Sequence, residues 1–460
     1  MDPQELQRRF LDKKGADINL ILSHNNSTIN LDLHSFVLVN SCEFFNALIL
    51  FPGKKSSTIE VPDVDIVRDI IASFYCVKEN STNYPEWKYI LLTLKCKDYL
   101  CLPMDVTMLY HLEIPPEGFE LFFQTAELFG DMTSDRKLMR SIRINLPLDY
   151  DLTIFSEEFV KELFRKNQLI VSSGSDCSIK IWDAEIGECL RTLKGHADWV
   201  CSVAFSSNDK LIVSGSCDKS IKIWDAEKGE CLRTLTGHSI AIGSVAFSSD
   251  NKLIVSGSSD NSIKIWDVET GECVKTINAD SGWVRMATFS NNDKLIGSGN
   301  GDNSIKIWDV ETGECLKTLN KHSDGVCCVV FSSDDKLIVS SSCDNSIKIW
   351  DTQIGECLKS FDGHSDFVCN VILGNNSIIS GSADKSIKIW NAETGECLKT
   401  LEGHSGPIWS VAFSSYTKLI GSGSKDGSIK IWNAETGECL RTLNGHSGSI
   451  WCVAFSHIQS

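Results

Sequence analysis

The pentapeptide Ser-Ile-Lys-Ile-Trp occurs seven times in this chain and sets a period for most of its length. The copies end at Trp182, Trp224, Trp266, Trp308, Trp350, Trp390 and Trp432. They are 42 residues apart, except for a spacing of 40 between the fifth and sixth copies. Each period holds four short runs of alternating apolar and polar residues separated by Gly, Ser, Asn and Asp, which is the pattern of antiparallel strands. Four strands per period predict a radial all-β array over residues 166–457.

Composition limits the class of partner. The chain has 460 residues and a net charge of −17, which argues against binding to nucleic acid, because phosphate neutralisation requires an excess of Lys and Arg. No apolar run approaches the length of a membrane span, so we expect no membrane partner. The first residues, MDPQELQRRF, contain no apolar signal core, which predicts a cytoplasmic location.

The cysteines do not suggest a disulfide framework. Seven of the nineteen occupy one repeated position: Cys189, Cys231, Cys273, Cys315, Cys357, Cys397 and Cys439. Copies of one position lie a repeat apart and cannot pair with one another. No Cys-x-x-Cys pair occurs, so we predict no zinc or other metal site. We interpret the thiols as small, buried apolar groups in a reducing compartment.

At the repeats the chain resembles the WD40 family. The family's Gly-His dipeptide occurs five times, and in all seven copies the Trp is followed by Asp or Asn. The histidines of the dipeptides are His196, His238, His364, His404 and His446. The resemblance implies a seven-bladed β-propeller, with a hydrogen-bonded set of His, Ser, Asp and Trp in each blade. Two such sets are His196, Ser214, Asp218 and Trp224, and His446, Ser172, Asp176 and Trp182. A His–Ser–Asp group could be read as a nucleophile triad, but its repetition beside a Trp favours a structural role.

The two ends of the repeat region complement each other. The first repeat begins at its second strand, near Gln168, whereas the last residues supply a Gly-His and a lone first strand. We therefore predict that strand 450–456 pairs with residues 169–172 and that His446 serves the blade of Trp182. Such closure removes open sheet edges.

One blade departs from the pattern. Ala279-Asp280 replaces Gly-His, so Asp280 is expected to face Asp302. Two facing carboxylates require protonation or outward rotation of one of them. We expect the blade of Trp308 to be the loosest.

The repeats differ most at two places, three and five residues after the His, which we call the rim positions. The resemblance implies that these, with the residue before the turn Asp, line one face around the central channel. Apart from Trp87 and the repeat tryptophans, every Trp falls at a rim position. The candidate partner-binding residues are Trp199, Trp283, Arg285, Phe367, Trp409, Lys425 and Trp451. Aromatic residues with an Arg are typical of interface hot spots; packing between blades is the alternative.

The N-terminal half has no repeat. Residues 17–105 read as strand, strand, helix, strand, helix, helix. With Asp17 before a strand, His34 opening a helix, Phe45 within it and Phe74-Tyr75 ending another, the segment resembles the BTB/POZ family, although Cys42 stands where that family usually has Ser. An unrelated α/β domain is the alternative. Residues 1–16 form an N-terminal segment, and residues 106–165 are predicted to be a helical extension.

The combination resembles the BTB/POZ and WD-repeat proteins of giant DNA viruses. That resemblance implies a homodimer through the BTB domain and a substrate-recruiting adaptor for a cullin-type ubiquitin ligase, with a protein or peptide on the propeller face. The stretch LILFPGKKSST lacks the acidic residue that cullin-binding BTB domains often carry, which leaves a ligase-independent scaffold open.

Enzymatic function is not expected. No phosphate-binding loop, metal-ligand spacing or general acid–base pair occurs, so we predict no cofactor. A rim cysteine such as Cys201, Cys327 or Cys369 could act as a nucleophile, but no His occupies a neighbouring rim position.

Overall fold

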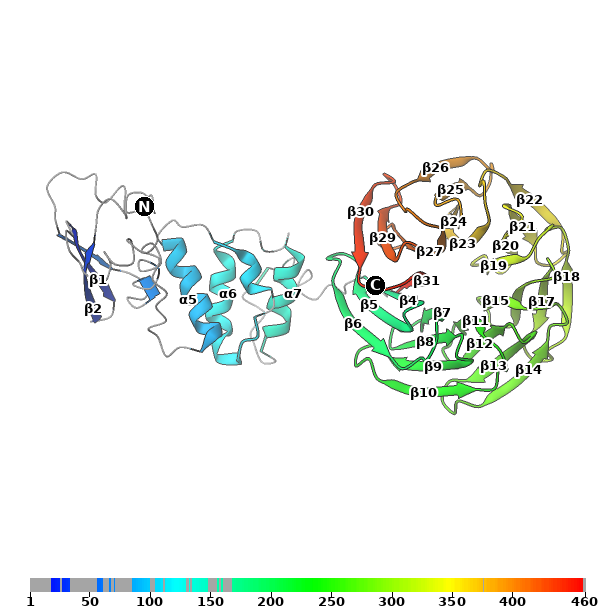
Figure 1. The fold of residues 1–460 in the computed structure, drawn as a ribbon, viewed down its shortest axis with the longest axis horizontal. Helices are drawn as coiled ribbons and strands as arrows, with labels where there is room; N and C mark the ends of the chain where they lie inside the picture. The colour runs from blue at the N-terminus through cyan, green and yellow to red at the C-terminus, as the bar shows by residue number, and fades with distance from the viewer. Residues whose placement is uncertain are drawn as a thin grey trace. The chain divides into compact units, whose positions relative to one another are not determined.

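The structure is a computed structural model, and the chain divides into two compact units, Met1–Arg165 and Lys166–Ser460. The described residues of the first unit are 18–24, 27–33, 56–60, 66–67, 70, 85–99, 104–110, 112–129, 132, 135–147, 155–156 and 159. Those of the second are 168–374 and 376–457. Each unit is considered separately below (Figure 1).

The second unit is a seven-bladed propeller of seven four-stranded antiparallel sheets. The innermost strands are β7 (Val200–Phe205), β11 (Ile242–Phe247), β15 (Val284–Phe289), β19 (Val326–Phe331), β23 (Val368–Gly374), β27 (Ile408–Ser414) and β31 (Ile450–Phe455). The second strands are β4 (Leu169–Gly174), β8 (Leu211–Ser216), β12 (Leu253–Ser258), β16 (Leu295–Asn300), β20 (Leu337–Ser342), β24 (Ser377–Ser382) and β28 (Leu419–Ser424).

The third strands carry the repeated pentapeptide: β5 (Ser178–Asp183), β9 (Ser220–Asp225), β13 (Ser262–Asp267), β17 (Ile305–Asp309), β21 (Ile347–Asp351), β25 (Ile387–Asn391) and β29 (Ser428–Asn433). The outermost strands are β6 (Cys189–Lys194), β10 (Cys231–Thr236), β14 (Cys273–Asn278), β18 (Cys315–Leu319), β22 (Cys357–Phe361), β26 (Cys397–Leu401) and β30 (Cys439–Asn444). Figure 1 shows the innermost strands around the centre and the outermost strands on the perimeter.

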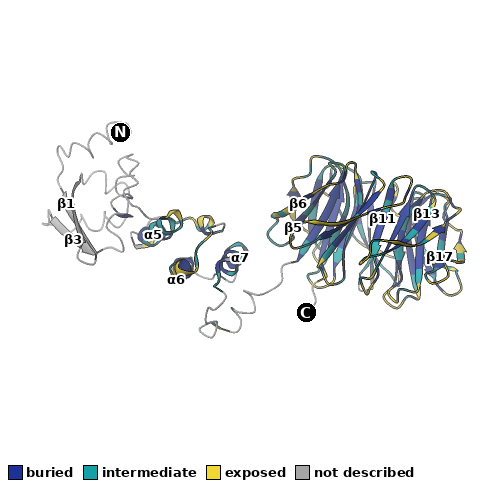
Figure 2. Cartoon of the chain, turned by 90° about the horizontal axis from the view of Figure 1, so that it is seen from below, coloured by how far each residue is buried: buried dark blue, intermediate teal, exposed yellow. Residues whose placement is uncertain are grey.

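The core lies between neighbouring blades. In β8 the residues after Leu211 are all buried, whereas in β10 only Leu235 is buried. Figure 2 shows buried segments along the strands of the propeller and exposed ones at its loops. Leu235 packs with Trp266 of the next blade, so each blade covers the face of its neighbour. Burial of this large apolar face in every blade is the main favourable contribution to the fold.

The repeated cysteines correct one expectation. They open the outermost strands, and six of the seven are exposed, while Cys357 is half-buried. The prediction that they are buried apolar groups is wrong, because an outermost strand has no neighbouring strand on its far side. Their thiols instead lie near local polar groups; the sulfur of Cys189 is 3.4 Å from the carbonyl oxygen of Arg191.

The ring is closed by strands from the two ends of the repeat region. β31 pairs antiparallel with β4, with Val453 opposite Ser172 and Phe455 opposite Ile170. Next to this ladder the Gln168 amide donates to the carbonyl oxygen of Ser456 at 2.8 Å. The closing blade therefore has the same four-stranded form as the other six.

The first unit contains a three-stranded sheet in the order β2-β1-β3. β1 (Ile18–His24) is antiparallel to β2 (Ser27–Leu33) and parallel to β3 (Ser56–Glu60). A parallel neighbour requires a crossover connection. The helix predicted for that connection, with His34, Cys42 and Phe45, lies outside the described residues, as does Phe74-Tyr75.

Helices follow the sheet in the first unit: α5 (Glu86–Tyr99), η1 (Val106–Leu109), η2 (Pro116–Gly118), α6 (Phe119–Glu127) and α7 (Arg136–Asn145). Leu94 of α5, Phe122 of α6 and Ile142 of α7 belong to one buried cluster. The end of the predicted helical extension, residues 148–165, lies largely outside the described residues. Among the helices that are described, none has the length and apolar character needed to cross a membrane.

Candidate functional site

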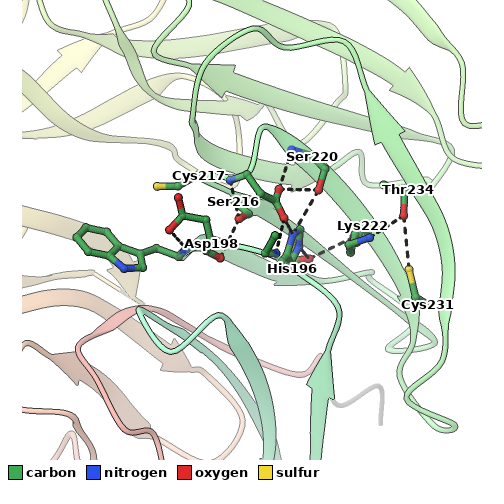
Figure 3. A network of polar contacts seen from close by, with 12 residues as sticks. His196, Asp198, Ser216, Cys217, Ser220, Lys222, Cys231 and Thr234 are labelled. Atoms are coloured by element: carbon green, nitrogen blue, oxygen red, sulfur yellow. Dashed lines mark hydrogen bonds and ion pairs between the residues drawn. The ribbon is translucent and has the colours of Figure 1, made fainter.

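Six blades contain a four-residue hydrogen-bonded set, which we call the tetrad. In the blade of Trp224 the indole Nε1 donates to Ser214 Oγ at 2.8 Å, and that hydroxyl lies 2.8 Å from His196 Nε2. The other ring nitrogen, Nδ1, is 2.8 Å from Asp218 Oδ2. Figure 3 shows His196 beside Ser220, whose hydroxyl oxygen lies 3.4 Å from the same nitrogen. Because an indole can only donate, the serine proton is free to point to Nε2 and Nδ1–H to point to the carboxylate. The tetrad is thus fully satisfied with a neutral imidazole.

The closing blade has the same arrangement, although its residues come from opposite ends of the repeat region. His446 Nε2 is 2.8 Å from Ser172 Oγ, and its Nδ1 is 2.9 Å from Asp176 Oδ2. Trp182 Nε1 donates to Ser172 at 2.8 Å. The tetrads fix the loops that lead into the innermost strands and so hold the rim in place.

Burial and hydrogen bonding shift the titration of these groups. Burial lowers the pKa of His196, and the contact with Asp218 only partly offsets this effect. Burial alone would raise the pKa of Asp218, but hydrogen bonds from Ser220, the Ala197 backbone and His196 lower it to about 2. The tetrad is therefore a neutral imidazole beside a carboxylate at neutral pH, which suits a scaffold and leaves no free nucleophile.

The blade of Trp308 lacks a tetrad histidine. The expected arrangement, in which the carboxylates of Asp280 and Asp302 face each other, does not occur. Asp280 is exposed, so it has taken the outward orientation, and Asp302 accepts from Ser304 instead. The Lys306 ammonium donates to the carbonyl oxygen of Ala279 at 2.6 Å. In the blade of Trp266 the equivalent lysine, Lys264, donates to a threonine of the outermost strand. Lys306 thus contacts the backbone of the segment that replaces Gly-His.

The rim positions gather aromatic side chains around the channel. Trp451 lies between two other tryptophans: its ring centroid is 5.7 Å from that of Trp199 and 5.3 Å from that of Trp409. The interplanar angles are 25° and 22°, so the three indoles form a stack across three neighbouring blades. Trp199 is 47% exposed, which leaves one end of the stack open to solvent.

Trp283 and Arg285 form a second group on the rim. The Arg285 guanidinium lies 5.0 Å from the Trp283 ring centroid, within the range of a cation–π contact. Trp283 is 52% exposed and lies over Gly301, where any Cβ would clash with the indole at 1.8 Å. Gly301 is the residue before the turn Asp, so the absence of a side chain there makes room for Trp283.

A cavity of about 670 Å³ opens between the innermost strands. Of the candidate residues it is lined by Trp283, Arg285, Phe367, Trp409 and Trp451. The indole Nε1 atoms of Trp409 and Trp451 are buried and, among the described residues, have no hydrogen-bond partner. Buried donors without an acceptor are uncommon and point to a role for the group.

Lys425 lies apart from this cavity. It is exposed and lines a separate, polar hollow of about 500 Å³ together with Asp426 and the 444–449 loop. Trp199 does not line the cavity either, but its contact with Trp451 joins it to the rim group. The structure therefore brings together six of the seven candidates and separates Lys425.

Two pairs of cysteines lie beside the channel, and the sequence analysis named only one member of each, Cys201 and Cys327. Cys201 and Cys217 have sulfurs 3.3 Å apart, and Cys327 and Cys343 have sulfurs 3.4 Å apart. Cys217 and Cys343 occupy the position before the turn Asp, from which sequence reasoning selected only Lys425. The signal that could have identified these pairs is that two blades carry cysteine at the same two positions of the repeat. Among the described residues no group of three or more His, Cys, Asp or Glu side chains could hold a metal ion.

Comparison with known proteins identifies the repeats. A family model described as "WD domain, G-beta repeat" matches eight segments: residues 161–183, 187–225, 229–267, 271–309, 313–351, 355–391, 395–433 and 437–458. A BTB/POZ domain and WD-repeat protein of Acanthamoeba polyphaga mimivirus is 36% identical over 211 residues, which is 44% of this chain and 42% of that protein. The chain thus spans less than half the length of this relative.

Two other mimivirus proteins show the same kinship. A second BTB/POZ domain and WD-repeat protein is 32% identical over 200 residues, 42% of each chain. A BTB/POZ domain-containing protein is 33% identical over 179 residues, which is 38% of this chain and 67% of that protein.

Proposed function

This chain belongs to the WD40-repeat family and is a relative of BTB/POZ domain proteins, and from that premise we propose that it is a non-enzymatic protein-interaction protein. In this proposal the rim captures a segment of a protein partner, and the N-terminal half joins the complex to a larger assembly. We place its action in the cytoplasm, because the described cysteines are all free and many are exposed, which suits a reducing compartment.

The observation that carries the proposal is the stack of Trp199, Trp451 and Trp409, of which Trp451 and Trp409 line the cavity. Stacked indoles offer a rigid apolar surface that costs little conformational entropy to bind. The Nε1 atoms of Trp409 and Trp451 are buried and have no partner among the described residues; if the indoles turn toward the cavity, a bound polypeptide carbonyl would supply an acceptor to each. Packing between blades accounts for the stack but not for these two unpaired donors.

The charges around the rim indicate the chemistry of the partner segment. Asp198, Asp324 and Asp366 each precede a rim position and are exposed. With the net charge of −17, they favour a partner segment that carries basic side chains beside its apolar contact.

The rim assignment is tested by purifying the full chain from host cells and identifying bound proteins by mass spectrometry. We expect Trp451→Ala to reduce recovery of a specific partner by at least about tenfold, as hot-spot truncations do. Tyr416→Ala is the matched control, because Tyr416 is an exposed aromatic in the β27–β28 turn at the opposite end of the blade. A Trp451→Ala chain that melts earlier yet retains every partner would show that the stack serves packing alone.

For the N-terminal half we propose a BTB domain that forms a homodimer and joins a cullin-type ubiquitin ligase, so that the propeller presents substrates. Support comes from the relatives with BTB/POZ in their names and from the parallel β1–β3 pairing. The missing acid in LILFPGKKSST favours the second candidate, a bivalent scaffold independent of a ligase.

Two measurements on the full chain separate these candidates: its mass in solution and its binding to a purified cullin scaffold. A dimer that binds the cullin supports the adaptor. A dimer that does not bind supports the scaffold, and a monomer would contradict the proposed dimer in both.

A further inference from the structure

The Cys327–Cys343 pair has the geometry of a dithiol that can close. Cys327 is the extra residue of a bulge at the start of β19, where Val326 pairs with Ser342 and Cys328 with Ser341. The Cys343 amide donates to the carbonyl oxygen of Gly325 at 2.9 Å, which holds the two backbones together. The sulfurs are 3.4 Å apart, and a disulfide bond is about 2.05 Å long, so a small side-chain rotation suffices.

The guanidinium of Arg285, from the neighbouring blade, contacts both sulfurs. Arg285 Nη1 is 3.2 Å from Cys327 Sγ and 3.1 Å from Cys343 Sγ. The hydrogen bond from Cys327 lowers the pKa of Cys343; burial opposes this effect and the Arg285 charge reinforces it. The same pairing, together with burial, raises the pKa of Cys327. These effects favour the thiolate at Cys343 and the protonated thiol at Cys327.

The chain contains its own comparison site. Cys201 and Cys217 occupy the same two positions in another blade, with sulfurs 3.3 Å apart. The rim residue that corresponds to Arg285 in the blade before it is Trp451, which carries no charge. The two pairs therefore differ chiefly in whether a guanidinium contacts them.

We propose that Cys343 and Cys327 form a peroxide-reactive dithiol at the mouth of the channel, with Cys343 as the attacking thiolate and Cys327 as the resolving thiol. Both cysteines line the cavity, so a small oxidant has access. This chemistry is separate from the proposed partner binding, and its test does not depend on whether a partner is found.

The reaction consists of two displacements. The Cys343 thiolate attacks one oxygen of hydrogen peroxide, the O–O bond breaks, and hydroxide leaves and takes a proton from solvent; the sulfur becomes a sulfenic acid. The Cys327 sulfur then attacks that sulfur, an S–S bond forms, the S–O bond breaks, and the leaving hydroxide takes the Cys327 proton. In sum, two thiols and one hydrogen peroxide give one disulfide and two waters.

The test treats the reduced full chain with hydrogen peroxide, alkylates the remaining thiols and maps the peptides by mass spectrometry over time. We expect the Cys327–Cys343 disulfide to form at least about tenfold faster than a Cys201–Cys217 disulfide and to be reversed by a dithiol reductant. Equal rates for the two pairs, or no disulfide between Cys327 and Cys343, would overturn the proposal.

Variants test the separate roles. Cys327→Ser should leave a sulfenic acid at Cys343 that a dimedone probe captures, and an absence of adduct contradicts the assignment of Cys343. Arg285→Gln should slow alkylation of Cys343, whereas Arg285→Lys should restore part of the rate. The control is Lys385→Gln, which removes an exposed cation from the turn after β24. An equal effect of Lys385→Gln and Arg285→Gln would mean that only the general field matters, and would remove Arg285 from the site.

Discussion

At the scale of single residues, the tetrad serine is the central polar group of each blade. Ser214 is fully buried; it accepts from Trp224 and lies within hydrogen-bond distance of His196. In the blade of Trp308 the corresponding Ser298 is equally buried and accepts from Trp308 at 2.9 Å, but no histidine is present. The two serines therefore differ by one partner in otherwise similar surroundings.

This difference gives a matched pair of substitutions. Ser214→Ala leaves both the Trp224 N–H and His196 Nε2 without a partner and should lower the free energy of unfolding by about 2–3 kcal/mol. Ser298→Ala strands only one group and should cost about 1 kcal/mol. Denaturant unfolding followed by tryptophan fluorescence compares them, since of the twelve tryptophans only Trp87 lies outside the propeller. Equal losses would show that the histidine contact contributes nothing.

At the scale of elements, the blade of Trp308 shows what the Gly-His dipeptide supplies. Gly237 has φ +154° and packs so closely on Trp266 that a Cβ would lie 3.1 Å from the ring. A side chain is unfavourable there on both counts. Ala279 and Asp280 instead follow another course, in which Asp280 has φ +45°, and the buried hydroxyl of Ser281 has no partner among the described residues.

Restoring the dipeptide should therefore stabilise this blade. We expect the double substitution Ala279→Gly with Asp280→His to raise the free energy of unfolding by about 1 kcal/mol, as added buried hydrogen bonds do. Asp280→His alone is the comparison variant and should give a smaller gain, because Ala279 keeps a Cβ in the cluster that contains Trp308. Lys321 before His322 shows that a complete tetrad also forms without the glycine. Thermal melting of both variants provides the measurement; equal gains from the two variants would show that the glycine contributes nothing to stability.

At the scale of the whole propeller, closure depends on residues that are far apart in the sequence. Deleting residues 445–460 removes β31 and His446, which leaves β4 with an open edge and Ser172 without its histidine. We expect a lower melting temperature and association of the truncated chain through the exposed edge. Calorimetry and light scattering measure the two effects, and an unchanged melting temperature would mean that closure does not stabilise the ring.

The tetrads also make the propeller sensitive to acid. Burial lowers the folded-state pKa of His196, His238, His404 and His446 below the usual value near 6.5. The unfolded chain then binds more protons, so stability is full above pH ~6.5 and falls as the pH drops through that value, by up to about 1.4 kcal/mol per pH unit for each histidine.

A second loss is expected at lower pH. The folded-state pKa values of Asp218 and Asp260 are lowered to about 2, so their contribution disappears as the pH falls from about 4 towards 2. Denaturant midpoints at pH 7.5, 5.5 and 3.5 measure both steps. Identical midpoints at pH 7.5 and 5.5 would contradict a neutral tetrad imidazole.

The repeat fold and the tetrads could be predicted because each depends on spacing within one repeat. The pentapeptide fixes a strand, and Ser, Asp and Trp stand at constant offsets, so the contacts of Ser214 with Trp224 follow from local register. The two rim positions of each blade were likewise found from their offset after the position of the histidine. The N-terminal half lacks such repetition, and its predicted helix at residues 34–49 lies outside the described residues.

The sequence alone thus determined the blade and the number of blades, and it singled out five of the residues that line the central cavity. Only the tertiary structure decided what those residues touch. Trp199 stacks on Trp451 from the far end of the chain, and Arg285 reaches the sulfurs of the next blade. It also decided that the repeated cysteines are exposed and that Asp280 points outward. The physical reason is that burial and side-chain pairing depend on the neighbouring blade, which is 42 residues away for Arg285 and Cys327 and at the other end of the repeat region for Trp199 and Trp451.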